Sequence, residues 1–238
     1  MNLLLFSQQT LSKANTLEVH GRQYHHLRDV LNVTVGSKVR VGAIGGQIGC
    51  AQVLAIDDSS AMLRVKLDSQ PPPPLPLTLV LALPRPKMMR RVIQTVASLG
   101  VKEIHLINSY RVDKSYWQTP WLEPESLREQ CLLGLEQSGD TQLPQIYLHK
   151  RFKPFVEDEL PAIASGTKPL VAHPYNAAPC PVSLTEPTTL AVGPEGGFIS
   201  YEIDKLVACG FQPVTLGARI LRVETAIPVL IARLFTAV

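Results

Sequence analysis

The chain has 238 residues, of which 45% are hydrophobic and 18% are charged, and its formal net charge is +3. This composition is that of a globular protein with enough apolar residues for a sizeable core, and it excludes a disordered or fibrous chain. A net charge this small does not by itself predict a nucleic-acid partner.

The four cysteines, Cys50, Cys131, Cys180 and Cys209, lie far apart and form no C-x-x-C pair. We therefore expect no metal site and no disulfide framework. No apolar run approaches the ~18 residues of a membrane-spanning helix, and the start MNLLLFSQQTL lacks the basic residues of a secretory signal. These features predict a cytoplasmic protein with no membrane partner.

The first 70 residues are predicted to form mostly strands. Apolar and polar residues alternate in 38–44 and 62–67, and a Gly-Gly pair separates the first of these from an apolar run at 47–56. Residues 23–31 carry apolar side chains at helical spacing. Together these elements predict a small β-barrel with one helix.

A proline-rich segment, PPPPLP at 71–76, follows this region. Consecutive prolines donate no backbone hydrogen bonds and favour an extended polyproline II spacer. We therefore divide the chain into a domain of residues 1–70, a linker of residues 71–76 and a domain of residues 77–238.

In the second domain, strand and helix patterns alternate, which predicts an α/β fold with a largely parallel sheet. Ligands of such sheets bind beyond the carboxyl ends of the strands. Strands are expected at 77–83, 101–107, 170–172, 189–192 and 213–216, and helices at 87–99, 124–138, 200–209 and 225–237.

Two loops of this domain stand out for their glycines and arginines. The first is GPEGG at 193–197, whose glycines let the backbone approach a ligand closely. An ordinary turn between a strand and a helix, with no ligand, could have the same sequence. GPEGG matches neither a P-loop nor G-x-G-x-x-G. The second is LGARILRVETA at 216–226, where Arg219 and Arg222 precede a helix that Thr225 would cap. Arginines at a helix start oppose the macrodipole, so an anionic ligand would explain them better than a solvated surface.

A third loop, LPRPKMMRR at 83–91, has four basic residues and no acidic one. It is typical of a phosphate-contacting patch, and equally of a solvated run of charges. The basic residues are Arg85, Lys87, Arg90 and Arg91.

The motif GPEGGF followed by Glu202, then LGARILRVETA, together with QTVASLGV and LEQSG, closely resembles the ribosomal RNA small-subunit methyltransferase E family of the SPOUT superfamily. The resemblance covers essentially the whole chain. It implies a parallel α/β sheet with a C-terminal deep trefoil knot, an exception among protein folds, preceded by a small PUA-like β-barrel. It also implies a homodimer and no metal.

The resemblance further implies that S-adenosylmethionine is the cofactor, held by three loops largely through backbone groups. The positions implied as cofactor-binding are Leu83, Ala172, His173, Pro174, Val192, Gly193, Pro194, Glu195, Gly196, Leu216, Gly217, Ile220, Leu221, Arg222 and Thr225.

The reaction that the resemblance implies is methylation of N3 of a uridine in 16S ribosomal RNA. Loss of the N3 proton leaves an anion spread over O2 and O4, which a guanidinium would stabilise. Arg222 is the first candidate for this role and Arg219 the second. Glu195 would accept a proton or brace its loop, with bracing preferred, and His173 is expected to be a loop residue rather than a base.

Small-subunit RNA, free or in the assembled 30S subunit, is the implied partner. The chain departs from the family at Asn32, Ser98 and Asp140, where charge is altered outside the cofactor loops, so a different RNA is one alternative. A knotted RNA-binding assembly factor without turnover is another. The residues expected to contact RNA are Arg22, Arg28, Arg85, Lys87, Arg90 and Arg91.

Overall fold

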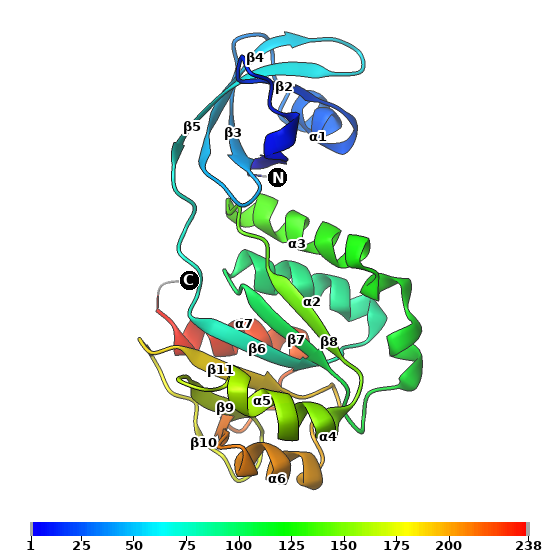
Figure 1. Cartoon of the computed structure of the whole chain (residues 1–238), viewed down its shortest axis with the longest axis vertical. Coiled ribbons are helices and arrows are strands. Elements are labelled where there is room, and N and C mark those ends of the chain that lie inside the picture. Colours follow the sequence, from blue (N-terminus) through cyan, green and yellow to red (C-terminus); the bar gives the residue numbers. More distant parts are fainter. Residues whose placement is uncertain (1, 237–238) are drawn as a thin grey trace. The chain divides into compact units, whose positions relative to one another are not determined.

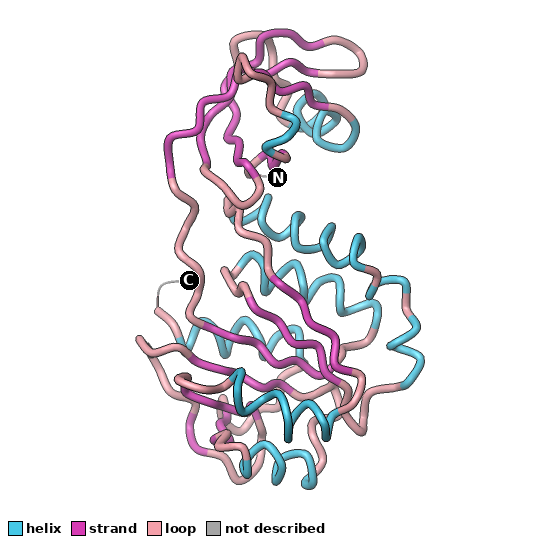
Figure 2. The backbone as a smooth tube through the Cα atoms, viewed as in Figure 1, coloured by secondary structure: helices cyan, strands magenta, loops and turns pink. Residues whose placement is uncertain are grey.

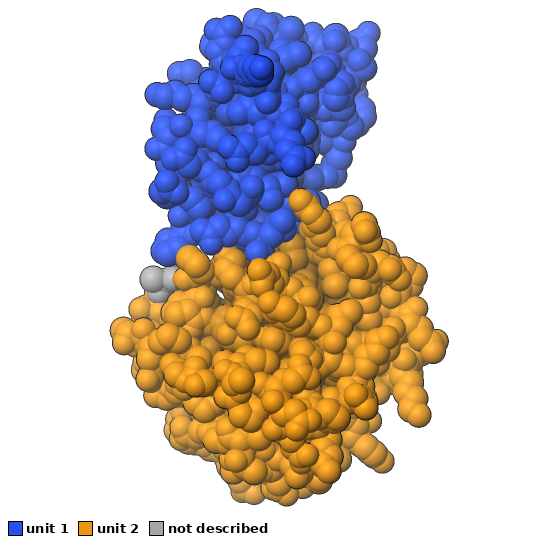
Figure 3. All heavy atoms as spheres, in the orientation of Figure 1, with its two compact units in different colours: residues 1–73, 132–143 blue, residues 74–131, 144–238 orange. Residues whose placement is uncertain are grey.

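The protein is described here by a computed structural model, which covers residues 2–236. The chain forms two compact units (Figure 3). Unit 1 comprises the residues up to Pro73 together with Leu132–Leu143, and unit 2 comprises Pro74–Cys131 and the residues from Pro144 onward. The boundary at Pro73 falls within the proline-rich segment. The division made from the sequence did not include the return of Leu132–Leu143 to unit 1.

Unit 1 contains a five-stranded sheet in the order β1-β3-β4-β5-β2, in which only the β1–β3 pair is parallel (Figure 1). The pattern of β5 shows why these segments are strands: Leu63 and Val65 point into the core, while Arg64 and Lys66 between and after them are exposed. The bounds are β1 Leu4–Phe6, β2 Thr16–Val19, β3 Lys38–Ala43, β4 Ile48–Ile56 and β5 Ala61–Ser69.

The helix predicted at 23–31 is present in unit 1 but differs in its bounds and form. It begins as α1 (Gly21–His25) and continues as the π-helical turn η2 (His26–Val30). Tyr24 and Leu27 are each 1% exposed and pack into the core of the sheet. The apolar spacing thus located the helix, and the short 3-10 segment η1 (Gln8–Thr10) was not anticipated.

Long-range packing explains why Leu132–Leu143 belongs to unit 1. Leu135 is fully buried in a cluster with Leu3, Leu5 and Ile48. The backbone amides of Asn2 and Leu3 donate to the carbonyl of Glu136 at 2.8 and 3.0 Å. The unit boundary therefore falls inside helix α3 (Pro124–Ser138).

Unit 2 is built on a seven-stranded sheet, and every pairing described for it is parallel. This confirms the predicted α/β fold with a parallel sheet. The strand order is β10-β12-β9-β11-β6-β7-β8. The strands, drawn in magenta in Figure 2, have the bounds β6 Leu77–Ala82, β7 Glu103–Ile107, β8 Gln145–His149, β9 Lys168–Ala172, β10 Ala178–Pro179, β11 Thr188–Val192 and β12 Gln212–Thr215.

The central strands of unit 2 are the ones that the sequence indicates most clearly. β11 is buried along its whole length, and β6 lies beside it with nearly every position buried. Strand β8 was not predicted, because it lies at the edge of the sheet and three of its five residues are exposed. Its sequence therefore lacks the apolar run that marks the central strands.

Helices flank the unit 2 sheet, with α2 packed beside α7 and α6 beside the π-helical turn η5 (Figure 1). Helix α2 buries Met89, Val92, Ile93 and Val96 along one face, and Gly100, with φ +85°, follows its end. The bounds are α2 Pro86–Ser98, α4 Phe152–Pro154, η5 Phe155–Glu159, α5 Leu160–Ile163, α6 Ser200–Ala208 and α7 Val223–Leu234, with 3-10 segments η3 Lys114–Gln118 and η4 Pro120–Leu122.

The start of α7 corrects one prediction. The N-cap residue is Arg222, not Thr225, because the carbonyl of Arg222 already accepts from the amides of Thr225 and Ala226 at 2.9 and 2.7 Å. Thr225 lies in the first turn. The predicted helix end at 237 lies outside the described residues, and α7 ends at Leu234. In the part of the chain that is described, none of the helices has the length and hydropathy needed to cross a membrane.

Candidate cofactor and substrate site

A cavity of about 770 Å³ lies where strands β9, β11 and β12 of unit 2 end. We call this side of the sheet, formed by the loops that follow β6, β7, β9, β11 and β12, the carboxyl edge. It is the side where parallel sheets bind their ligands. The walls are residues 172–176, 192–200, 214–216 and 219–221, with Arg111, Val223, Ala226 and Leu230.

Most positions implied as cofactor-binding lie on these walls. Of the others, Leu83 is fully buried and Gly217 is exposed, and neither lines the cavity as described. Arg222 and Thr225 are exposed at the start of α7. The positions on the walls are Ala172, His173, Pro174, Val192, Gly193, Pro194, Glu195, Gly196, Leu216, Ile220 and Leu221.

The two candidate arginines of the LGARILR segment are placed differently. Arg219 lines the cavity and is exposed. Arg222 lies between Leu221 and Val223, which both line the cavity, while its own side chain is turned to solvent. Arg222 is therefore beside the mouth of the cavity, where it is accessible to a substrate that approaches from outside.

The GPEGGF loop needs glycine at one tight turn and at one close approach. Gly197, at φ +73°, closes a turn in which its amide donates to the carbonyl of Pro194 at 2.7 Å. A Cβ atom on Gly196 would lie 2.8 Å from Cδ of Arg111, which is too close without a shift of that side chain. The Arg111 guanidinium donates to the carbonyl of Gly196. Arg111, from the loop after β7, thus holds the GPEGGF loop after β11, across the end of β6 between them.

Glu202 joins two loops of the carboxyl edge. Glu202 is 2% exposed, and its carboxylate accepts hydrogen bonds from the backbone amides of Tyr110 and Ile199 at 2.7 and 3.0 Å. The hydroxyl of buried Ser109 donates to the same carboxylate at 3.2 Å. Sequence reasoning quoted Glu202 as part of the motif and assigned it no role. Glu202 lies three residues after the N-cap residue Ile199, the place of the glutamate in a capping box, but isoleucine lacks the side-chain acceptor of that motif, so the sequence carries no such signal.

Glu195 makes the contact that a bracing role requires. Its carboxylate accepts from the backbone amide of Arg85 at 3.1 Å, at the N-terminus of helix α2, where the helix dipole favours a negative charge. The Arg85 guanidinium Nε lies 4.0 Å from the same oxygen. This contact therefore holds the loop after β6 against the loop after β11, and the loop after β11 forms part of the cavity wall.

His173 lies on the cavity wall as a neutral residue. Burial lowers the pKa of its imidazole below the usual value, so the ring is uncharged near neutral pH. Its backbone amide donates to the carbonyl of Val214 at 2.9 Å, and its ring meets Tyr175 edge-on at 5.9 Å. These contacts hold the loop after β9 against β12.

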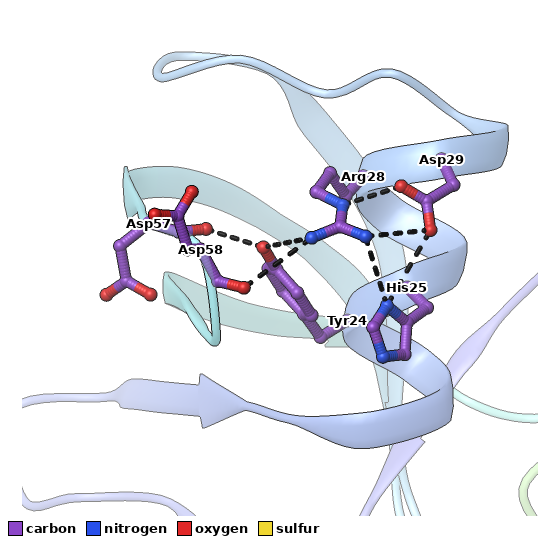
Figure 4. A network of polar contacts seen from close by, with 6 residues as sticks. All are labelled: Tyr24, His25, Arg28, Asp29, Asp57 and Asp58. Atoms are coloured by element: carbon purple, nitrogen blue, oxygen red, sulfur yellow. Dashed lines mark hydrogen bonds and ion pairs between the residues drawn. The ribbon is translucent and has the colours of Figure 1, made fainter.

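In unit 1, the arginines expected to contact RNA have carboxylate partners. Arg22 donates to the buried carboxylate of Glu136 at 2.7 Å. Arg28 donates to Asp29 at 2.6 Å and to the hydroxyl of Tyr24 at 3.2 Å, and this network continues to the Asp57 and Asp58 carbonyls (Figure 4). The paired Arg28 guanidinium lowers the pKa of Asp29, and Asp29 in turn raises the pKa of Arg28.

The basic residues of the loop after β6 and of α2 are all exposed. The guanidinium of Arg90 lies over the ring of Trp121 at 4.3 Å. Arg85 is held through its backbone, so its side chain, 66% exposed, projects from a fixed position. This set consists of Arg85, Lys87, Arg90 and Arg91.

Two of the family departures have local structural roles. Asn32 adopts φ 49°, a left-handed conformation that asparagine tolerates better than most residues, directly after the unit 1 helix. Asp140 is 4% exposed and accepts from the amides of Thr141 and Gln142 at 2.6 and 2.9 Å. The third, Ser98, donates to the carbonyl of Thr95 in the last turn of α2. Within the described residues, no group of three His, Cys, Asp or Glu side chains is arranged to hold a metal ion.

Comparison with known protein families gives the class of this protein. The family model for the RNA methyltransferase domain matches residues 71–235. Ribosomal RNA small subunit methyltransferase E of Treponema pallidum is 29% identical over 95% of this chain and 87% of its own length, and that of Synechocystis is 30% identical over 98% and 76%. The chain belongs to the ribosomal RNA small subunit methyltransferase E family, within the RNA methyltransferase domain class.

The fold of a solved relative agrees along almost the whole chain. The crystal structure of ribosomal RNA small subunit methyltransferase E from Neisseria gonorrhoeae, bound to S-adenosyl methionine, has a TM-score of 0.74 at 24% identity. It covers 98% of this chain and 95% of its own.

Proposed function

We propose that this protein transfers a methyl group from S-adenosylmethionine to N3 of a uridine in 16S ribosomal RNA. The observation that carries the proposal is the meeting of three loops, after β9, β11 and β12, around one cavity of about 770 Å³. Two of them, the loops after β11 and β12, contain the family motifs GPEGGF and LGARILRVETA. The names of the relatives support ribosomal RNA as the substrate, and the ligand of the Neisseria structure supports the cofactor.

The residues on the cavity wall suit S-adenosylmethionine. Val192, Leu216, Ile220 and Leu221 offer apolar surface for a flat adenine ring, and the glycine-rich segment 193–197 offers backbone groups close to the cavity. When bound, the cofactor supplies a methyl group on a sulfonium that needs no further activation. The chain's own task is then to hold the uridine in line with that methyl group.

The uridine must lose its N3 proton before N3 attacks. The anion that results is stabilised by a guanidinium near O2 and O4, which lowers the pKa of N3. Arg222 is our first candidate, because it is exposed between two residues of the cavity wall and therefore accessible to a base outside the cofactor site. Arg219 is the second. Glu195, already bound to the amide of Arg85, braces its loop.

The remaining expectations concern architecture and assembly. We place a PUA-like RNA-binding barrel in unit 1 and a trefoil knot in the C-terminal part of unit 2, where the segments after β11 and β12 face the same cavity. We propose a homodimer formed by unit 2 in the cytoplasm, where small-subunit RNA or the 30S subunit is found. The apolar helix α7, on which Val229 is 41% exposed, supports this assembly.

The test is a search for 3-methyluridine in ribosomal RNA by mass spectrometry. Ribosomal RNA from a strain lacking the gene should lack one 3-methyluridine, and purified protein with S-adenosylmethionine should restore it. Methylation of another RNA would keep the chemistry and change the substrate. Absence of any methyl transfer, with RNA binding retained, would identify a non-catalytic assembly factor.

A further inference from the structure

One exposed aromatic side chain at the carboxyl edge has no part in the cavity. Tyr110 follows β7 and is 79% exposed, the largest exposed fraction among the large hydrophobic residues described. Its backbone is fixed, because its amide donates at 2.7 Å to the buried carboxylate of Glu202. The residues on either side of the Tyr110–Arg111 pair, Ser109 and Val112, are 2% and 6% exposed. The ring thus projects into solvent from an anchored loop.

This loop is tied directly to the wall of the cavity. Arg111, the next residue, lines the cavity and donates to the carbonyl of Gly196. Glu195, beside Gly196, accepts from the amide of Arg85. Strands β11, β6 and β7 are consecutive in the sheet, so these contacts link the loops that follow all three strands. We call these linked loops, from the cavity wall to Tyr110, the ridge.

The ridge combines an exposed ring with positive charge. The guanidinium of Arg85 and the ammonium of Lys87 are exposed at the start of α2, and Arg111 is exposed beside the ring. An aromatic ring on a fixed backbone loses little conformational freedom when a planar partner stacks on it. Aromatic side chains interspersed with basic ones are how proteins hold unstacked nucleotides, since every base has a π-face and every linkage a negative charge.

We propose that Tyr110 is a stacking platform for an unpaired base of the RNA segment that carries the target uridine. The platform lies outside the cavity, so the stacked base is a neighbour of the uridine, and Arg85, Lys87 and Arg111 hold the phosphates on either side. This inference rests on the proposed function. It assigns Tyr110 to the RNA and leaves S-adenosylmethionine binding to the cavity.

The experiment separates base stacking from phosphate contact. Binding of two single-stranded probes of about ten nucleotides, an oligouridylate and the same ribose-phosphate chain without bases, is measured by fluorescence anisotropy with the full-length protein. Wild type should bind the oligouridylate more tightly. Tyr110→Ala should lose about tenfold or more in affinity for the oligouridylate and none for the abasic chain, whereas Tyr110→Phe and Tyr110→Trp should retain binding.

Two further variants serve as controls. Tyr147→Ala removes a tyrosine that is 42% exposed on edge strand β8, and it should leave both affinities unchanged. Lys87→Ala should weaken both probes equally, because it removes a charge and no stacking surface. Light scattering on Tyr110→Ala should give the oligomeric state of wild type, since a change would assign the ring to a subunit contact instead.

The possible failures are distinguishable. Equal binding of the two probes by wild type, or unchanged oligouridylate affinity in Tyr110→Ala, would overturn the stacking platform even in an enzyme that methylates ribosomal RNA. A loss in Tyr110→Leu no greater than in Tyr110→Phe would show a general apolar contact and also overturn it. Absence of methyl transfer to ribosomal RNA by wild type would overturn the proposed function, whatever the oligonucleotides show.

Discussion

The arginines of unit 1 and those at the carboxyl edge of unit 2 differ in what they contact. Arg22 and Arg28 each donate to a carboxylate of their own unit, and Arg28 also closes the network of Figure 4. At the carboxyl edge, Arg219 faces the cavity and Arg222 faces solvent beside it. The same residue type therefore stabilises one unit and is accessible to ligands in the other.

This difference shows why charge alone is a weak guide to a binding site. A guanidinium and the carboxylate that it contacts have no net charge together, so the pair attracts a phosphate only after it separates. An exposed guanidinium without a close carboxylate partner can bind a phosphate with no ion pair to break first. The predictions below test whether the two sets of arginines, and the loops that carry them, behave in these two ways.

The largest effect is expected for Arg222→Ala. If Arg222 stabilises the uridine anion, its loss should slow methyl transfer about a hundredfold or more, on the order of 3 kcal/mol, and leave S-adenosylmethionine affinity nearly unchanged. Single-turnover kinetics at saturating RNA measure the chemical step. A normal rate at saturation would exclude Arg222 from catalysis, and Arg219→Ala would then be examined in the same assay.

A second prediction concerns the backbone of the GPEGGF loop. Gly196→Val should weaken S-adenosylmethionine binding by about tenfold or more, because the new Cβ displaces Arg111 from the Gly196 carbonyl and adds bulk at the cavity wall. Calorimetry measures the affinity. In an Arg111→Ala background the added loss should shrink, since the two changes act on one contact. Unchanged affinity in Gly196→Val itself would argue against cofactor binding in this cavity.

A third prediction compares the two sets of arginines directly. Arg85→Ala should reduce the salt dependence of RNA binding by about one phosphate contact, without lowering the thermal midpoint, because its guanidinium is 66% exposed and its 4.0 Å separation from Glu195 makes a weak ion pair. Arg28→Ala should leave the salt dependence of RNA binding unchanged and lower the thermal midpoint, because it removes the contacts with Asp29 and Tyr24 in unit 1. Melting curves and salt titrations of the two variants provide the comparison. A lower salt slope in Arg28→Ala would show that its ion pair opens to bind RNA.

The sequence predicted the elements whose signals are local. The apolar run at 77–83 became β6, and the glycine and arginine motifs marked two of the three loops that line the cavity. The return of Leu132–Leu143 to unit 1 could not be predicted, because it depends on Leu135 packing against Leu3 and Leu5, far away in the chain. Arg111 was missed for the same reason: its role comes from contact with Gly196, 85 residues later.

The smallest expected effect is a pH dependence of stability centred on His149. This ring lies at the end of β8, with Nδ1 3.3 Å from the carboxylate of Glu159 and Nε2 3.0 Å from Nδ1 of His105. The other ring nitrogen of His105 lies 2.9 Å from Glu103. Burial lowers the pKa of His149 below its usual value of 6.5, and His105 lowers it further, against the opposing charge of Glu159.

A lowered histidine pKa means that the unfolded chain binds the proton more readily than the folded one. The stability contributed by neutral His149 is therefore complete above about pH 6.5 and is lost as the pH falls toward the folded pKa. His149→Gln keeps a hydrogen-bonding side chain and removes the titration, so its thermal midpoint should fall less than that of wild type between about pH 7.5 and about pH 5.5. His20→Gln, at an exposed position, is the matched control. Because the pKa of His173 is also lowered by burial, some dependence should persist in His149→Gln. Parallel curves for wild type and His149→Gln would mean that His149 contributes nothing to it.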